Sequence, residues 1–193
     1  DQLDARPVRP LLLPVPTADL HPLSANQEQM LVLFDLDRTS PVYNMDDVQR
    51  FDEQLDVSAV RRCLEALAER HPTLRTHIAQ DSVTGETMQR VVAMSAYELN
   101  FEVLVVEDGS ESGEAFVSRL CDAPFDLHSG SWVRFGLLQH GEGADGGGST
   151  FVLVMHHIAG DGWSDLVLTL EFVALYEAAT ADERLLGITL CAT

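Results

Sequence analysis

The chain has 193 residues, 46% of them hydrophobic, which is enough for one domain with a sizeable core. Its 31 acidic and 12 basic side chains give a net charge of −19, and such a negative field argues against nucleic acid and anionic membranes as partners. The three cysteines lie far apart without CxxC spacing, which argues against a zinc site or a disulfide framework and favours a reducing, cytoplasmic setting.

The chain begins with a proline-rich stretch that does not predict a helix. Five of the eight prolines lie in residues 1–22, and proline fixes φ and removes backbone donors, so we expect residues 1–21 to form an arm or linker. The ordered domain is expected over residues 22–180. Ser24 and Gln27 have the spacing of a capping box, which predicts the start of a short helix.

A second helix and a hairpin are expected next. Apolar residues recur at helical spacing after Asp56, which can cap the helix start, and Pro72 ends the helix. Residues 73–80 and 88–93 are strand-like and flank the turn-forming sequence at 81–86, so they predict a β-hairpin.

Residues 100–107 predict a half-buried strand. Phe101, Val103 and Val105 alternate along it and are expected to share the buried face. A helix should follow and stop near Pro124, because proline cannot continue a helix.

The last third predicts two further strands and a helix. Residues 131–139 and 149–157 are strand-like, and the glycine-rich sequence at 140–148 predicts a flexible hairpin connection between them. Ser164 can cap a helix that carries apolar residues over 166–176. Together the elements predict an α/β fold of the α+β type, a mixed sheet with helices packed on it.

The sequence MHHIAGDGWS at residues 155–164 is the most informative stretch for chemistry. Side chains alternate along a strand, so His156 and His157 should point to opposite faces, one into a cleft and one buried or braced. Gly160 and Gly162 would let the following turn bring backbone donors close to a substrate oxygen.

Several chemistries compete for this stretch. Opposed histidines argue against shared metal ligation, and no HExxH pattern is present. The order GDGWS differs from the GxSxG of a serine-hydrolase elbow. Two interpretations remain from the residues alone: a histidine that acts as a base or proton carrier near neutral pH, or an ordinary packed histidine.

Several motifs in order give the chain a family resemblance. HHIAGDG at 156–162 matches HHxxxDG, PLSANQEQMLVL at 22–33 is similar to LSxAQxRLWxL, and RHPTLRT at 70–76 is similar to RHxxLRTxF. SPVYN at 40–44 and PFDL at 124–127 agree as well. The chain thus resembles the condensation domains of nonribosomal peptide synthetases, in the chloramphenicol acetyltransferase-like superfamily, and specifically their N-terminal lobe.

The resemblance implies a reaction and its partners. Condensation domains have two lobes with a tunnel between them, into which upstream and downstream peptidyl carrier domains insert phosphopantetheine arms. The acceptor amine attacks the donor thioester and an amide forms. The resemblance implies no metal and no cofactor bound by the domain itself, because the phosphopantetheine belongs to the carriers.

It also implies roles for individual residues. His157 would take a proton from the attacking amine or orient it, and the Gly162 N–H would face the developing oxyanion. Asp161 would be structural, paired with an arginine for which Arg75 is our candidate, and pointing away from the cleft. His156 would support the site from the buried side.

Three departures from the family pattern qualify this interpretation. In the first motif, Gln29 and Leu31 stand where the family usually has an arginine and an aromatic residue. The resemblance ends near residue 180 and the sequence at 181–193 matches nothing that we can place, so the second lobe has no counterpart, whether by excision or by natural truncation. Asp47 and Gln49 replace aliphatic residues in strand-like 44–51 and are expected to face a dry core. We expect a lobe that is inactive without its C-terminal lobe; the alternatives are a standalone acyltransferase completed by oligomerisation and a non-catalytic docking lobe.

Overall fold

The computed structural model describes residues 20–106, 113–128, 130–141 and 147–180. The expected arm, apart from its last two residues, and the whole tail at 181–193 lie outside the described residues. The elements of the described part, in chain order, are β1 (Leu20–Pro22), α1 (Ala25–Leu36), β2 (Asn44–Phe51), α2 (Val57–Arg70), the 3₁₀ helix η1 (Pro72–Arg75), β3 (Thr76–Gln80), β4 (Thr87–Val91), the 3₁₀ helix η2 (Met94–Ala96), β5 (Phe101–Val106), α3 (Gly113–Asp122), β6 (Val133–His140), β7 (Ser149–His156) and α4 (Gly162–Thr180).

Two sheets organise these elements. The larger one has the order β2-β7-β6-β5, in which β5 and β6 are parallel and the other pairs are antiparallel. The smaller one has the order β1-β4-β3, with both pairs antiparallel. The predicted hairpins β3–β4 and β6–β7 are confirmed, and so is the mixed α/β fold with helices packed on the sheet.

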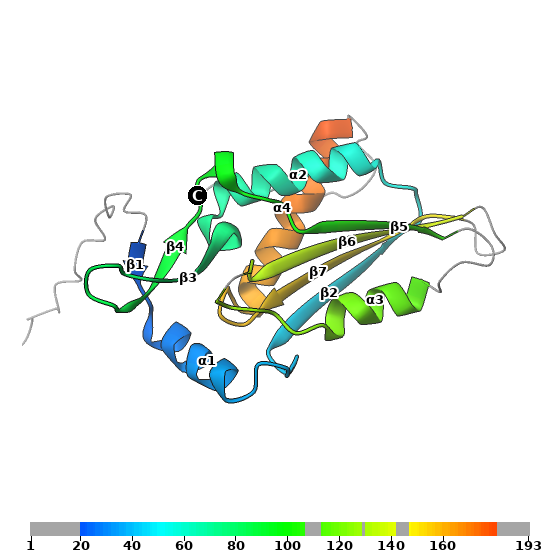
Figure 1. Cartoon of the computed structure of the whole chain (residues 1–193). Helices are drawn as coiled ribbons and strands as arrows, with labels where there is room; N and C mark the ends of the chain where they lie inside the picture. The colour runs from blue at the N-terminus through cyan, green and yellow to red at the C-terminus, as the bar shows by residue number, and fades with distance from the viewer. Residues whose placement is uncertain (1–19, 107–112, 129, 142–146, 181–193) are drawn as a thin grey trace, which may run out of the picture.

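Helices cover both faces of the larger sheet (Figure 1). On one face α4 packs on β7, where the rings of Phe151 and Phe172 stack with centroids 4.2 Å apart, and α2 packs on α4. On the other face α3 lies against β6, at Gly136, where an added Cβ would collide with Leu120. All eight residues of β7 are buried. Among the residues that the structure describes, no helix combines the length and apolar character needed to cross a bilayer.

The starts of α1 and α2 follow the predicted capping signals. Ser24 and Gln27 form a full capping box at the start of α1: the Ser24 hydroxyl accepts from the Gln27 N–H, and the Gln27 side chain accepts from the Ser24 N–H. Asp56 caps α2 by accepting from the Ala59 N–H at 2.6 Å. Both predictions are confirmed.

The prediction for the buried face of β5 is wrong. Val103 and Val105 are 39% and 51% exposed, while Leu104 and Val106 pack against the core together with Phe101. Apolar side chains occur on both faces of β5, so alternation in the sequence does not identify the inner face.

The expectation that two polar residues of β2 face a dry core is also wrong. β2 is an edge strand of the larger sheet. Asp47 is half-buried and accepts a 2.6 Å hydrogen bond from the Thr169 hydroxyl of α4, while Gln49 is exposed and donates to Asp47. Polar side chains suit an edge strand, because they discourage pairing with another chain.

Candidate active site at the end of β7

His157 lies directly after the central strand β7 and is exposed. Its backbone N–H donates to the Tyr43 carbonyl at 2.9 Å, in the segment that leads into β2. The structure therefore confirms the predicted strand with His157 at its C-terminal end. Because β7 is buried along its whole length, the core fixes the backbone position from which this imidazole projects.

His156 points to the opposite side and is only 3% exposed. Its Nδ1 accepts from the Ile158 N–H at 3.1 Å, and its ring packs among Phe34, Tyr43 and Phe125. Burial, with a smaller contribution from neighbouring His157, lowers the pKa of His156 to about 4. An imidazole that accepts at Nδ1 is neutral and carries its proton on Nε2. His156 is thus a packed histidine that braces the turn.

The helix after the turn is capped by Asp161, and the prediction that Ser164 is its cap is wrong. The Asp161 Oδ1 accepts from both the N–H and the hydroxyl of Ser164 at 2.9 Å. Ser164 in turn accepts from the Asp161 N–H at 3.3 Å, so the two residues form a reciprocal box three residues apart. These hydrogen bonds hold the pKa of Asp161 below its usual range.

The two glycines of the turn differ in what surrounds them. A Cβ on Gly160 would lie 2.8 Å from the Ser164 Cβ and 3.1 Å from the Met155 sulfur, so the turn packs tightly there. A Cβ on Gly162 would meet nothing within 4 Å. Gly162 is the first residue of α4, and among the described residues no acceptor binds its N–H. That donor is free, as the first N–H groups of a helix are.

His157 faces an open hollow of about 470 Å³. One wall is the turn itself, including Asp161, and the other wall is the N-terminal half of α1, including Asn26 and Gln29. Asp161 is among the lining residues, and its carboxylate is engaged by Ser164. Gly162 is exposed but is not among the lining residues.

Sequence reasoning missed the α1 wall. Asn26 and Gln29 stand where the family pattern has alanine and arginine, and both turn out to line the hollow opposite His157. The departure of Gln29 from that pattern was visible in the sequence. Nothing local linked it to a turn about 130 residues further along the chain.

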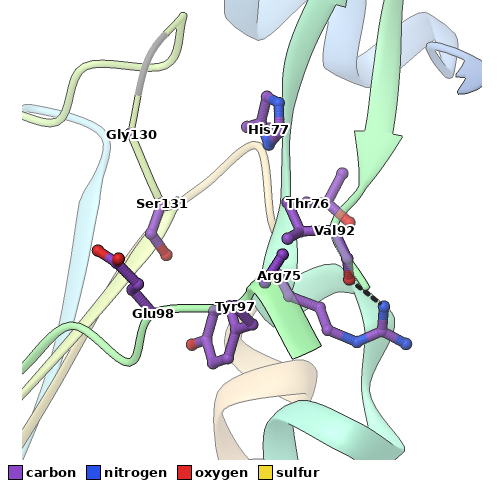
Figure 2. A pocket seen from close by; sticks show the side chains of 9 residues that line it. Arg75, Thr76, His77, Val92, Tyr97, Glu98, Gly130 and Ser131 are labelled. Carbon is purple, nitrogen blue, oxygen red and sulfur yellow. Dashed lines mark hydrogen bonds between the residues drawn. The ribbon is translucent and has the colours of Figure 1, made fainter. Parts of the chain in front are cut away.

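The predicted ion pair between Arg75 and Asp161 is absent from the described part of the chain. The Arg75 guanidinium instead donates to two backbone carbonyls, from Nε to Ala68 at 3.0 Å and from Nη1 to Val92 at 2.5 Å. Figure 2 shows this guanidinium turned toward Val92. Arg75 lines a small pocket of about 130 Å³ that shares no lining residue with the histidine hollow. The two carbonyls, near the end of α2 and just after β4, satisfy Arg75 locally.

The side chains at the histidine turn offer nitrogen and oxygen atoms for chemistry. Within the described ranges no group of three histidine, cysteine, aspartate or glutamate side chains is placed to hold a metal ion. The hollow offers an exposed imidazole, a carboxylate engaged in capping, and amide side chains from α1. Such a set can move a proton and donate hydrogen bonds to a substrate.

Comparison with known proteins agrees with this architecture. The condensation domain profile matches residues 17–186. The chain is 36% identical over 176 residues to a linear gramicidin synthase of Brevibacillus parabrevis, and 33% identical over 175 residues to a probable non-canonical nonribosomal peptide synthetase of Salinispora arenicola. These matches cover 89% and 91% of the chain and 2% of each relative.

Solved structures show the same fold. The starter condensation domain of rhizomide synthetase superposes with a TM-score of 0.74 at 20% identity, over 86% of this chain and 39% of that one. The first condensation domain of the CDA synthetase gives 0.69 at 18% identity, over 86% and 41%. The chain thus spans about two fifths of the condensation domain structures that it matches, which is consistent with one lobe. It belongs to the condensation domain family of nonribosomal peptide synthetases.

Proposed function

We propose that the chain is the N-terminal lobe of a condensation domain that joins a carrier-bound acceptor amine to a carrier-bound donor thioester, in the cytoplasm. The observation that carries the proposal is the exposed imidazole of His157, held at the end of a fully buried strand and open to a hollow. The buried neutral partner His156 and the free N–H of Gly162 support it.

The reaction makes one bond and breaks one. The acceptor nitrogen attacks the thioester carbonyl, the C–N bond forms, and the C–S bond then breaks as the thiolate leaves. His157 either accepts the proton that the amine loses or orients the amine and stabilises the charged intermediate; that proton ends on the departing sulfur. The N–H of Gly162 donates to the oxyanion as it develops. Asp161 keeps that N–H in place by capping α4.

A second lobe is part of the proposal, because the hollow is open. Amide formation needs the amine, the carbonyl and the base in near-attack geometry, with water excluded. In this chain one wall comes from α1 and one from the histidine turn. We propose that the C-terminal lobe of the domain closes the site and that upstream and downstream carrier domains deliver the substrates. Alone, the chain should condense nothing at a useful rate.

The test is reconstitution with a separately expressed C-terminal lobe from a related condensation domain, using aminoacyl carriers as donor and acceptor and mass spectrometry of the amide product. Turnover should appear only with both lobes, and His157→Ala should lower it by about a hundredfold or more. His140→Ala, at the other end of the β6–β7 hairpin, is the matched control and should retain activity.

Other outcomes would point to the alternatives. Activity of the chain alone, together with an oligomer on gel filtration, would favour a standalone acyltransferase whose site is completed between copies. If the two lobes associate but His157→Ala leaves turnover unchanged, the catalytic assignment is wrong. If they associate and no amide forms from any carrier-bound pair, a docking lobe is the better description.

A further inference from the structure

The turn that carries His157 is held from outside by a side chain of the preceding motif. The Thr73 hydroxyl donates to the Ala159 carbonyl at 3.1 Å, across 86 positions of sequence. Ala159 lies in the middle of the turn, and its own N–H donates to the His156 carbonyl at 2.8 Å. The hydrogen bond from Thr73 therefore binds the Ala159–Gly160 peptide, which lies between the end of β7 and the start of α4.

The segment that supplies Thr73 is itself rigid. Thr73 belongs to η1, which starts at Pro72 and includes Leu74, a residue with no exposed surface. Arg75 then fastens the end of η1 through its hydrogen bonds to the carbonyls of Ala68 and Val92. A donor on such a fixed element can position the group that it binds, whereas a donor on a loose loop would follow that group.

The same segment is also tied to α4. His71 Nε2 lies 2.7 Å from the Glu171 carboxylate, whose side chain is 10% exposed, and Arg70 approaches the other oxygen at 3.4 Å. Residues 70–73, which we name the brace, therefore contact the histidine turn at one end and the helix that follows the turn at the other. The brace therefore contacts both the turn that carries His157 and the helix that begins at Gly162.

We infer that Thr73 is a positioning residue: its hydroxyl fixes the turn so that the His157 imidazole and the Gly162 N–H keep the relative placement that amide formation requires. Thr73 does not line the histidine hollow and touches no reacting atom. The kinetic part of this inference rests on the proposed function; the positioning itself does not.

The test uses substitutions that separate the hydroxyl from the shape of the side chain. Thr73→Val keeps the volume and removes the donor, and Thr73→Ser keeps the donor. Thr84→Val, in the exposed β3–β4 loop, is the matched threonine control. In the purified chain, amide hydrogen exchange of Ile158 and Ala159 should be about threefold to tenfold faster in Thr73→Val, with a melting temperature lowered by only a few degrees, and normal in the other two variants.

A second readout is kinetic. In the reconstituted two-lobe reaction, kcat of Thr73→Val should fall about threefold to tenfold with KM changed less than about twofold, and Thr73→Ser should restore it. Unchanged exchange in Thr73→Val, or a kinetic loss that Thr73→Ser does not recover, would overturn the inference. If Thr73→Val does not fold, Thr73→Ala compared with Thr73→Ser gives the same decision. If His157→Ala proves active while the exchange result holds, the proposed function fails and the positioning role of Thr73 stands.

Discussion

The histidine turn at residues 156–164 and the surroundings of Arg75 satisfy their polar side chains in different ways. In the turn, the His156 ring accepts from the Ile158 N–H and the Asp161 carboxylate accepts from Ser164, so these two side chains find their partners within the turn. The Arg75 guanidinium is half-buried and takes its partners from the backbone of two neighbouring segments, at Ala68 and Val92. Sequence alone suggested that the two regions complete each other by an ion pair. The difference shows that backbone carbonyls can satisfy an arginine and that a helix start can satisfy an aspartate. Neither residue then needs a partner of opposite charge.

The largest expected effect separates the two glycines of the turn. Gly160→Ala should lower the free energy of unfolding by about 2–3 kcal/mol, because the new Cβ collides with Ser164 and Met155. Gly162→Ala is the matched control and should be neutral or slightly stabilising, since its Cβ meets nothing. Urea unfolding of both variants measures this. Equal stability of the two would mean that the turn is not tightly packed.

The next effect is a pH dependence that belongs to the turn. The pKa of His156 is about 4 in the folded chain, below the 6.5 of an unperturbed histidine. Because the pKa of His156 is lower in the folded state, the unfolded state takes up a proton first as the pH falls below 6.5. This uptake favours unfolding. His156 should therefore remove about 2 kcal/mol of stability between pH 7.5 and pH 5. His156→Asn keeps an acceptor for the Ile158 N–H and should lose this part of the pH dependence. Parallel curves for the two proteins would show that folding does not lower the pKa of His156.

A somewhat smaller effect tests the Arg75 side of the comparison. Arg75→Met should cost about 1–2 kcal/mol, because it leaves the carbonyls of Ala68 and Val92 without their donor. Arg62→Met, on the exposed face of α2, is the matched control and should change stability little. Thermal and urea unfolding measure both. A neutral Arg75→Met would mean that water replaces the guanidinium at both carbonyls.

The smallest effect concerns Asp161 and its independence of Arg75. Asp161→Ala should lower the melting temperature by a few degrees, as the loss of a helix cap does, and Asp161→Asn should restore it. In the double variant with Arg75→Met the two changes should add, because the residues share no contact. If the double variant is no less stable than Arg75→Met alone, the two residues are coupled, as an ion pair between them would make them.

Local signals in the sequence predicted much of this structure, and contacts between distant segments account for what they missed. The caps at Ser24 and Asp56, and the opposite faces of His156 and His157, depend on spacings of one to three residues, which the sequence displays directly. The α1 wall of the hollow and the buried face of β5 depend on how elements far apart in the chain pack. The partners of Arg75 are nearer in the chain, but they are backbone carbonyls, which no side-chain motif marks. The cap of α4 was missed for a different reason: Asp161 and Ser164 are both good capping residues, and only the geometry decides between them.

The complete burial of β7 has a consequence for redesigning this lobe. Shifting β7 by one residue would exchange its two faces and send His157 into the core, so the strand that carries the imidazole tolerates little change in register. Asn26 and Gln29, by contrast, are exposed and border the same hollow from a different element. A library meant to alter which substrates enter should vary those α1 positions and leave β7 untouched. Changes in α1 can alter the shape of the hollow while the position of the imidazole stays fixed.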